Sequence, residues 1–278
     1  MRVCVVQTNS IDDKAANLAQ VQRLVDRAAQ EDRPDLVLLP EVFAFQGGSP
    51  EARRAAAEPM PDGPTYGFLR DLAARHRIVL HGGSYLESDA DGGRLYNTTV
   101  AFGRDGQELA RYRKIHLFDV VTPEGREYRE SATVGRGGEI VTYDAGDGGG
   151  ARVGCSICYD LRFGELYRAL AAAGAEILAV PAAFTVETGR DHWEVLLRTR
   201  AIETGCYVAA AAQVGPYPIG TGKERRACWG HSMIVDPWGK ILAQVTDRPG
   251  FATARIDLGY LGRVREMIPV HQHRVLKG

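Results

Sequence analysis

Short apolar runs and amphipathic stretches alternate along the chain almost to its end. Apolar positions at helical spacing predict helices over about residues 14–30, over about 163–173, over Trp193–Glu203, and in a segment that opens at Gly63–Pro64. Continuous or alternating apolar runs predict strands at Arg2–Thr8, Asp35–Glu41, Ile78–Glu87, Tyr96–Phe102, Gln107–Lys114, Glu176–Pro181, Tyr207–Gln213 and Phe251–Ile256, with a hairpin over Met233–Leu242. No low-complexity linker interrupts the pattern, which predicts a single α/β domain over residues 1–278 with a large mixed sheet system.

The stretch Arg152–Asp160 reads as a buried strand that ends on a cysteine, Cys158, and then turns into a helix. At such a turn the positive end of the helix and free backbone N–H groups favour a thiolate. Ligands also gather at the carboxyl ends of strands in α/β sheets. Cys158 is therefore a candidate nucleophile, and the alternative is a thiol that simply packs at a strand end.

Cys155 and Cys158 form a C-x-x-C pair, so a redox or zinc site is a second alternative. In an extended strand their side chains point to opposite faces, which disfavours a disulfide. A zinc site needs more ligands, and Cys4, Cys206 and Cys228 form no second pair. We therefore expect no metal and no disulfide at this position.

Composition narrows the class of protein. The 278 residues carry a formal net charge of -1, and 45% are hydrophobic, which is ordinary for a globular protein. This charge gives no electrostatic case for nucleic acid or an anionic membrane, and no apolar run approaches the roughly 20 residues that cross a bilayer. Met1–Gln7 is too quickly polar for a signal peptide and reads as a first strand. The 5 cysteines, an odd number in a long chain, indicate free thiols and hence a cytoplasmic location.

A cysteine nucleophile needs a base and an oxyanion stabiliser. None of the 7 histidines has a neighbourhood that marks a Cys-His site. Glu41 ends a buried strand, where a carboxylate is costly unless it is paired or used, and the alternative is a solvated strand end. Lys114 ends the strand Gln107–Lys114, where alternation turns it inward and leaves Arg111 and Arg113 solvated; the alternative is an exposed basic run. A carboxylate, an ammonium and a thiol together form a set that can be buried.

Three segments resemble the signature segments of the nitrilase, or carbon–nitrogen hydrolase, superfamily: Leu39–Glu41, Tyr112–Leu117 and Cys158–Phe163. The similarity continues through Pro181–Phe184, His192–Glu194, Arg200–Glu203 and Trp229–Gly239. The resemblance implies a four-layer α-β-β-α sandwich and a Glu41, Lys114 and Cys158 triad. It also implies a second glutamate, Glu130, after the lysine. It further implies no cofactor, and a homodimer formed through the helices near 163–173 and 192–204.

Within the superfamily, the segments His192–Arg198 and Arg200–Thr204 resemble the deaminated-glutathione amidases more than the related ω-amidases. The resemblance implies hydrolysis of a small carboxamide to an acid and ammonia through a thioester. Lys114 and the Tyr159 backbone N–H would stabilise the oxyanion. Arg162, Phe184 and Thr188 would contact the carboxylate end of a keto acid, although Arg162 could instead pair with Asp160 or Glu165.

The chain departs from this branch in Pro216–Arg226 and in the loop at 119–130. The wider stretch 119–138 is irregular and polar, which is typical of an active-site loop. Both segments bear on the substrate. Four hypotheses about the function remain: a deaminated-glutathione amidase, an ω-amidase, a general aliphatic amidase or N-carbamoyl hydrolase, and an inactive scaffold that keeps the fold.

Overall fold

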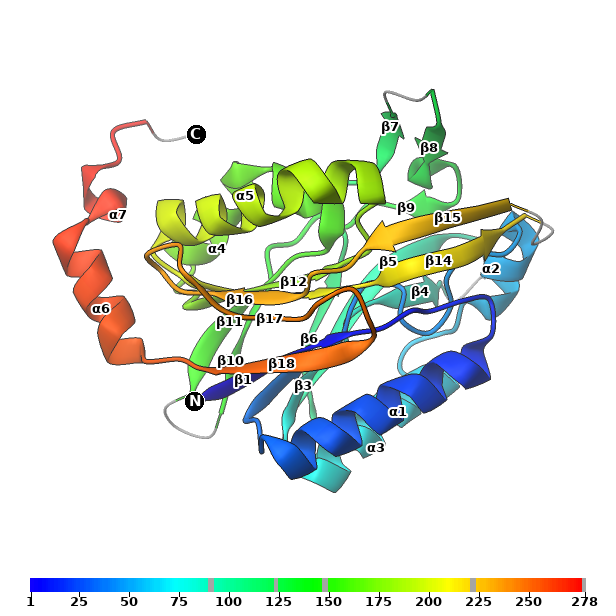
Figure 1. Ribbon diagram of the computed structural model, residues 1–278, viewed down its shortest axis with the longest axis horizontal. Helices are drawn as coiled ribbons and strands as arrows, with labels where there is room; N and C mark the ends of the chain where they lie inside the picture. Colours follow the sequence, from blue (N-terminus) through cyan, green and yellow to red (C-terminus); the bar gives the residue numbers. More distant parts are fainter. Residues whose placement is uncertain (90–92, 123–124, 147–149, 221–223, 277–278) are drawn as a thin grey trace.

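The computed structural model describes residues 1–89, 93–122, 125–146, 150–220 and 224–276. A larger and a smaller β-sheet pack face to face, and helices cover their outer faces (Figure 1). This is the four-layer α-β-β-α sandwich that the resemblance implies, and that prediction is confirmed.

The larger sheet has the strand order β18-β1-β2-β3-β5-β4, and β6 and β9 also pair with β5. Its neighbours β1, β2 and β3 run parallel. The strands are β1 (Arg2–Gln7), β2 (Leu36–Leu38), β3 (Val79–His81), β4 (Tyr85–Ser88), β5 (Leu95–Phe102), β6 (Glu108–Arg113), β9 (Val134–Gly135) and β18 (Gly250–Arg255).

The smaller sheet has the order β10-β11-β12-β13-β16-β17, with β11, β12 and β13 parallel. Its strands are β10 (Thr142–Ala145), β11 (Ala151–Cys155), β12 (Ile177–Ala182), β13 (Tyr207–Ala212), β16 (Met233–Val235) and β17 (Ile241–Gln244). Separate antiparallel hairpins are formed by β7 (Asp119–Val121) with β8 (Glu127–Arg129), and by β14 (Val214–Ile219) with β15 (Glu224–Trp229).

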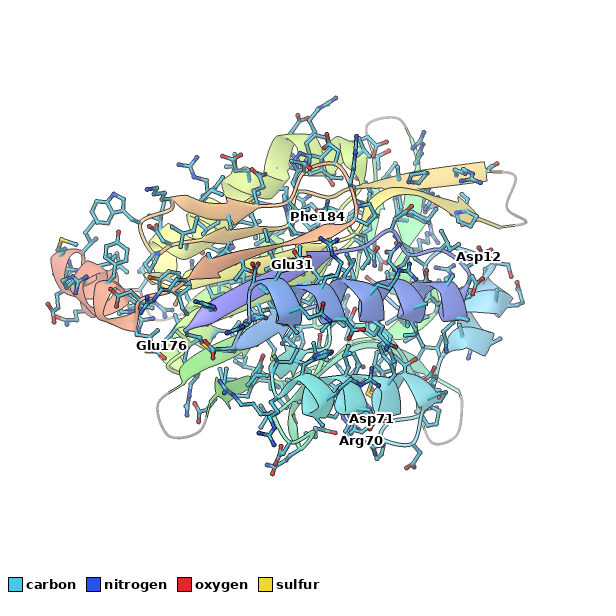
Figure 2. All side chains as sticks on the ribbon, turned by 60° about the horizontal axis from the view of Figure 1, so that its bottom comes forward. Asp12, Glu31, Arg70, Asp71, Glu176 and Phe184 are labelled. Carbon is cyan, nitrogen blue, oxygen red and sulfur yellow. The ribbon has the colours of Figure 1, made fainter. Side chains whose placement is uncertain are left out.

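Helices α1 (Lys14–Glu31) and α3 (Pro64–His76) cover the larger sheet, and α4 (Gly164–Ala172) and α5 (Val186–Thr204) cover the smaller one (Figure 1). In Figure 2, Asp12 lies just before the start of α1, and Glu31 is the last residue of that helix. The remaining helices are α2 (Pro50–Ala56), α6 (Leu258–Met267), α7 (Val270–His273) and the 3-10 turns η1 (Glu130–Ala132) and η2 (Cys158–Arg162).

The side chains of the continuous apolar strands are divided between separate cores. Along β1, Val3 and Val5 face the core between the sheets, whereas Cys4 and Val6 face α1 and α3. A strand that is buried on both faces shows no alternation of polarity in its sequence. This explains why β1 and β2 read as uninterrupted apolar runs.

The structure corrects several predicted boundaries. Residues 119–138 are not irregular throughout, because they contain the β7–β8 hairpin, η1 and β9. The predicted strand Ile78–Glu87 is broken into β3 and β4 at Gly82 and Gly83; Gly83 has a φ of +58°, and a Cβ there would lie 2.1 Å from the Pro40 carbonyl oxygen. Helix α5 begins at Val186 rather than at Trp193, because the Thr185 side chain accepts from the Thr188 N–H.

Candidate active site

Strand ends from both sheets meet at one place. Glu41 follows β2 by three residues, and Lys114 directly follows β6. In the smaller sheet, Cys158 follows β11 and Ala183 directly follows β12. Within each sheet the parallel strands gather side chains at their carboxyl ends, and the residues that follow β2, β11 and β12 line one cavity.

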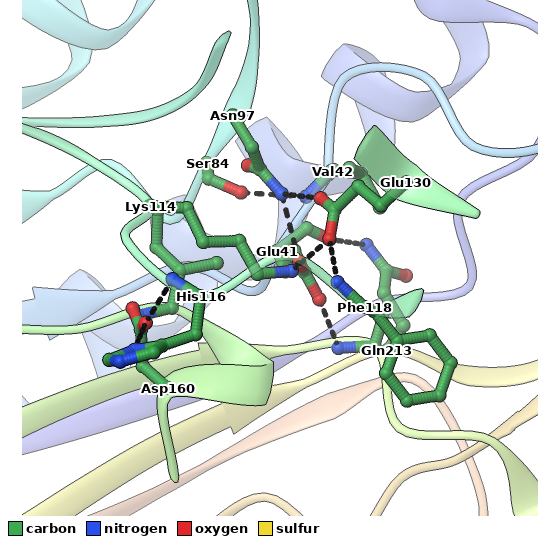
Figure 3. A network of polar contacts seen from close by, with 12 residues as sticks. Glu41, Val42, Ser84, Asn97, Lys114, His116, Phe118, Glu130, Asp160 and Gln213 are labelled. Carbon is green, nitrogen blue, oxygen red and sulfur yellow. Dashed lines mark hydrogen bonds and ion pairs between the residues drawn. The ribbon is translucent and has the colours of Figure 1, made fainter. Parts of the chain in front are cut away.

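Glu41, Lys114, Glu130 and Cys158 form what we call the charged cluster. Lys114 Nζ lies 2.9 Å from Glu41 Oε1 and 2.8 Å from Glu130 Oε2, so it bridges the carboxylates (Figure 3). Asn97 Nδ2 donates to both as well, at 2.9 Å to Glu41 and 3.2 Å to Glu130. Backbone N–H groups complete the network: Ala183 donates to Glu41 and Phe118 donates to Glu130, each at 2.8 Å.

Lys114 is only 1% exposed, and the predicted inward orientation is confirmed. Burial alone lowers the pKa of Lys114, but the carboxylates of Glu130 and Glu41 outweigh it and raise that pKa well above its ordinary value. The ammonium is therefore charged at neutral pH. The Arg113 side chain is 40% exposed, so its predicted solvation is confirmed, although it also forms two hydrogen bonds to the buried Glu87 and lies over the Tyr96 ring.

Cys158 is buried and lies at the first residue of η2 with a φ of +49°. Burial and the charge of Glu41 raise the pKa of its thiol well above the ordinary value, and the lowering by Lys114 does not offset this. The expectation that the turn favours a thiolate is therefore wrong, since η2 is only a short 3-10 turn beside a carboxylate. The resting thiol is neutral and needs a base to react.

Cys155 and Cys158 are both free thiols. Cys155 ends β11 with its side chain in the core between the sheets, where burial raises its pKa to about 12. The strand stops there, so the turn and not strand alternation sets the direction of Cys158. Within the described residues no group of His, Cys, Asp and Glu side chains is arranged to hold a metal ion.

Asp160 holds the turn that carries Cys158. Its carboxylate is fully buried and accepts from the Ile157 N–H at 2.8 Å and the Tyr112 hydroxyl at 2.7 Å. It also accepts from the backbone N–H of His116 at 3.0 Å, and His116 Nδ1 lies 2.7 Å away. Sequence reasoning missed this role, as it missed Asn97, because neither residue has a pattern that marks its partners.

The charged cluster lines a cavity of about 420 Å³. Each of the other predicted site residues also lines it: Tyr159, Arg162, Phe184 and Thr188. The Arg162 guanidinium carbon lies 5.4 Å from the Phe184 ring centroid, and its Nη1 lies 3.3 Å from His192 Nδ1. No carboxylate of the described residues lies within ion-pair distance of Arg162, so the pairing with Asp160 or Glu165 is absent there.

The family model for carbon-nitrogen hydrolases matches residues 2–266. The chain belongs to this family. It is 45% identical over 271 residues to the deaminated glutathione amidase of Synechocystis sp. (strain PCC 6803 / GT-S), covering 97% of this chain and 96% of that one. Nit3 of Saccharomyces cerevisiae, a member of branch 10 of the nitrilase superfamily, has a TM-score of 0.86 at 32% identity and covers 99% of this chain and 97% of its own.

An amidase of Nesterenkonia sp. AN1, solved after Michael addition of acrylamide at its active-site cysteine, has a TM-score of 0.74 at 27% identity. That match covers 98% of this chain and 99% of the amidase. This chain is thus an amidase of the nitrilase superfamily, a hydrolase of carbon–nitrogen bonds other than peptide bonds. In the described part of the chain, no helix has the length and apolar character needed to cross a membrane.

Proposed function

We propose that this protein is a cysteine-dependent amidase whose substrate is a small amide bearing a carboxylate, with deaminated glutathione as the leading candidate. The observation that carries the proposal is the bridge from Lys114 to Glu41 and Glu130, beside Cys158 in one cavity. The names of the relatives support the amidase reaction and the substrate. The Nesterenkonia amidase supports a reactive cysteine.

The first step is attack on the amide. Glu41 accepts the Cys158 proton, and the sulfur adds to the carbonyl carbon. The Lys114 ammonium and the Tyr159 backbone N–H then stabilise the oxyanion, a contribution whose loss typically costs on the order of 10²–10³ in rate. The raised pKa of the Cys158 thiol makes this proton transfer necessary, and that of Lys114 keeps its ammonium charged.

Collapse of the tetrahedral species breaks the C–N bond and leaves a thioester on Cys158. Protonated Glu41 donates its proton to the departing nitrogen, then takes a proton from water as the water attacks the thioester. When the C–S bond breaks and the acid leaves, Glu41 returns this proton to the Cys158 sulfur and the thiol is restored. Glu130 holds Lys114 in position, which its 2.8 Å contact to Nζ supports, and helps to place the substrate or the water.

Arg162, with Phe184 and Thr188, binds the carboxylate of the acyl part in this proposal, because a guanidinium that has no carboxylate partner among the described residues suits a substrate carboxylate. The second product depends on the amide. A primary amide such as α-ketoglutaramate gives ammonia. Deaminated glutathione has no primary carboxamide, and cleavage of its keto-acyl amide frees cysteinylglycine. The expectation of an acid and ammonia therefore applies only to primary amides.

A substrate panel tests this function and separates its alternatives. Product release from deaminated glutathione, α-ketoglutaramate, asparagine-like amides, N-carbamoyl amino acids and simple nitriles is compared by amine and ammonia assays. We expect the highest kcat/KM with deaminated glutathione; a preference for α-ketoglutaramate favours the ω-amidase alternative, and broad turnover favours the aliphatic amidase. If no amide is turned over, the inactive-scaffold alternative replaces the proposal.

Substitution of each cysteine of the C-x-x-C pair tests the nucleophile. Cys158→Ala is expected to lose turnover by at least about 10⁴-fold while remaining folded by circular dichroism. Cys155→Ala is the matched control and keeps most of the activity, because Cys155 points into the core between the sheets. The reverse result would show that the wrong cysteine has been chosen.

We also propose that the protein is a cytoplasmic homodimer. The apolar side chains Val195 and Ile202 on α5 are 64% and 54% exposed, and Trp238 beyond β16 is 53% exposed. These side chains support an interface over α5 and the turn between β16 and β17. Light scattering is expected to give twice the 30.3 kDa chain mass, and Ile202→Glu to shift it toward the monomer. A monomeric wild type at micromolar concentration contradicts the dimer.

A further inference from the structure

A row of aromatic rings crosses the cavity with a guanidinium at each end. Arg162 lies over Tyr159 at 5.9 Å, and Tyr159 contacts Phe118 at a centroid distance of 5.1 Å. Phe118 contacts Tyr128, also at 5.1 Å, and Arg226 lies 4.1 Å from the Tyr128 centroid. All of these residues line the cavity, and the Phe118 N–H donates to Glu130. The row therefore runs beside the charged cluster.

Arg226 comes from β15, in the segment where the chain departs from its branch. It pairs with Tyr217 across the β14–β15 hairpin and shares a strand face with Cys228, which is buried. Arg225 and Ala227 belong to the other face, and Arg225 is exposed. The hairpin thus turns the Arg226 side chain toward Tyr128 of the β7–β8 hairpin and into the cavity.

Two other arginines of the cavity wall, Arg54 and Arg129, differ from Arg226 in their contacts. Arg129 pairs with Glu127 and is 73% exposed, and Arg54 donates to the Gly93 carbonyl. No carboxylate of the described residues lies within ion-pair distance of Arg226, and its guanidinium lies over the Tyr128 ring. A guanidinium stacked on a ring keeps its edge N–H donors available, and these suit a carboxylate bidentately.

We infer that Arg226 binds a carboxylate on the amine side of the scissile amide, so that preferred substrates carry an anionic group on each side of the reacting carbonyl. The inference rests on the proposed function, in which Arg162 binds the acyl carboxylate. On C–N cleavage the amine takes the proton from Glu41 and leaves with its carboxylate.

Three substrates and one variant test this assignment. The substrates are deaminated glutathione, its C-terminal carboxamide, and α-ketoglutaramate, whose leaving group is ammonia. For the wild type we expect kcat/KM to be about 10- to 100-fold higher for the free carboxylate than for the carboxamide. Arg226→Gln is expected to remove this preference and to leave kcat/KM for the carboxamide and for α-ketoglutaramate within about twofold of wild type.

Two further variants separate recognition from structural support. Arg225→Gln removes a neighbouring charge on the opposite strand face and is expected to change none of the three rates. Arg226→Lys keeps the charge without the planar fork and is expected to keep part of the preference. An equal loss on all three substrates in Arg226→Gln would show that Arg226 only holds the hairpins together, and would overturn the inference.

The outcomes also separate this inference from the proposed function. Turnover of α-ketoglutaramate with no preference for a carboxylate on the leaving amine overturns the role of Arg226 alone. A wild type that hydrolyses none of the three substrates overturns the proposed function, and the inference falls with it.

Discussion

The charged cluster and the paired hairpins β7–β8 and β14–β15 border the same cavity but are built differently. Lys114 and Glu41 are 1% and 4% exposed, and their partners come from segments far apart in the sequence. On the hairpins, the ion pair of Glu127 and Arg129 is local and its side chains are 55% and 73% exposed. A substitution among the buried, mutually hydrogen-bonded charges therefore changes both the reaction rate and the free energy of unfolding. The exposed charges of the hairpins contribute little to stability, so their residues can differ between enzymes with different substrates.

Removal of the Lys114 ammonium from the charged cluster is expected to have the largest effect on activity and stability. Lys114→Met leaves Glu41 and Glu130 without the cation between them and the oxyanion without a donor. We expect kcat to fall about 10²–10³-fold and the free energy of unfolding to fall by about 3–5 kcal/mol. Enzyme kinetics and urea denaturation measure both. Lys240→Met, at an exposed position, is the control; activity of Lys114→Met within tenfold of wild type contradicts the role of Lys114.

Glu130 is the more accessible carboxylate of the cluster, with an 18% exposed side chain. Glu130→Gln keeps the shape but removes the charge that Lys114 and the Phe118 N–H contact. We expect kcat to fall about 10- to 100-fold, because Lys114 retains Glu41. The matched control is Glu139→Gln at an exposed position. Equal kcat values for the two variants would show that Glu130 has no role in the reaction.

Asp160 supports the cluster without belonging to it. Asp160→Asn weakens the contacts to Ile157, Tyr112 and His116 that hold the Cys158 turn. We expect a loss of about 1.5–3 kcal/mol in the free energy of unfolding and about tenfold in kcat, with KM little changed. Asp144→Asn, whose side chain is 60% exposed, serves for comparison. If Asp160→Asn has the same melting curve as the wild type, Asp160 does not stabilise the turn that carries Cys158.

Acid is expected to lower the free energy of unfolding through a buried histidine, without any substitution in the charged cluster. Burial lowers the pKa of His81 from 6.5 to about 3. The contribution of neutral His81 to the free energy of unfolding is fully present above pH 6.5. It is lost as the pH falls toward 3, because the unfolded chain binds a proton at a higher pH than the folded chain does. From pH 7 to 5 this costs about 2 kcal/mol of unfolding free energy. His81→Phe should reduce that pH dependence, and the exposed His273→Phe should not; identical slopes would contradict the assignment.

The sequence alone predicted the strands and contained the three segments that mark the family. Apolar runs and stops, which are local properties of the chain, predicted strand ends at Glu41, Lys114 and Cys158; the observed strands end three residues before Glu41 and Cys158 and one residue before Lys114. Alternation along β6 correctly predicted that Lys114 points inward, because burial on one face of a strand leaves a direct record in residue order. Alternation did not apply to Cys158, because β11 ends at Cys155 and the following turn sets the direction of the Cys158 side chain.

Other features were decided only by tertiary structure. Asn97 reaches both carboxylates, Asp160 collects donors from Tyr112 and His116, and Arg226 meets Tyr128 across separate hairpins. The pKa of Cys158 is raised where the sequence predicted that it is lowered, because the thiol is buried and lies near the Glu41 carboxylate. Charge and hydrogen bonding depend on distance in space and on burial, and neither is recorded in the spacing of residues along the chain.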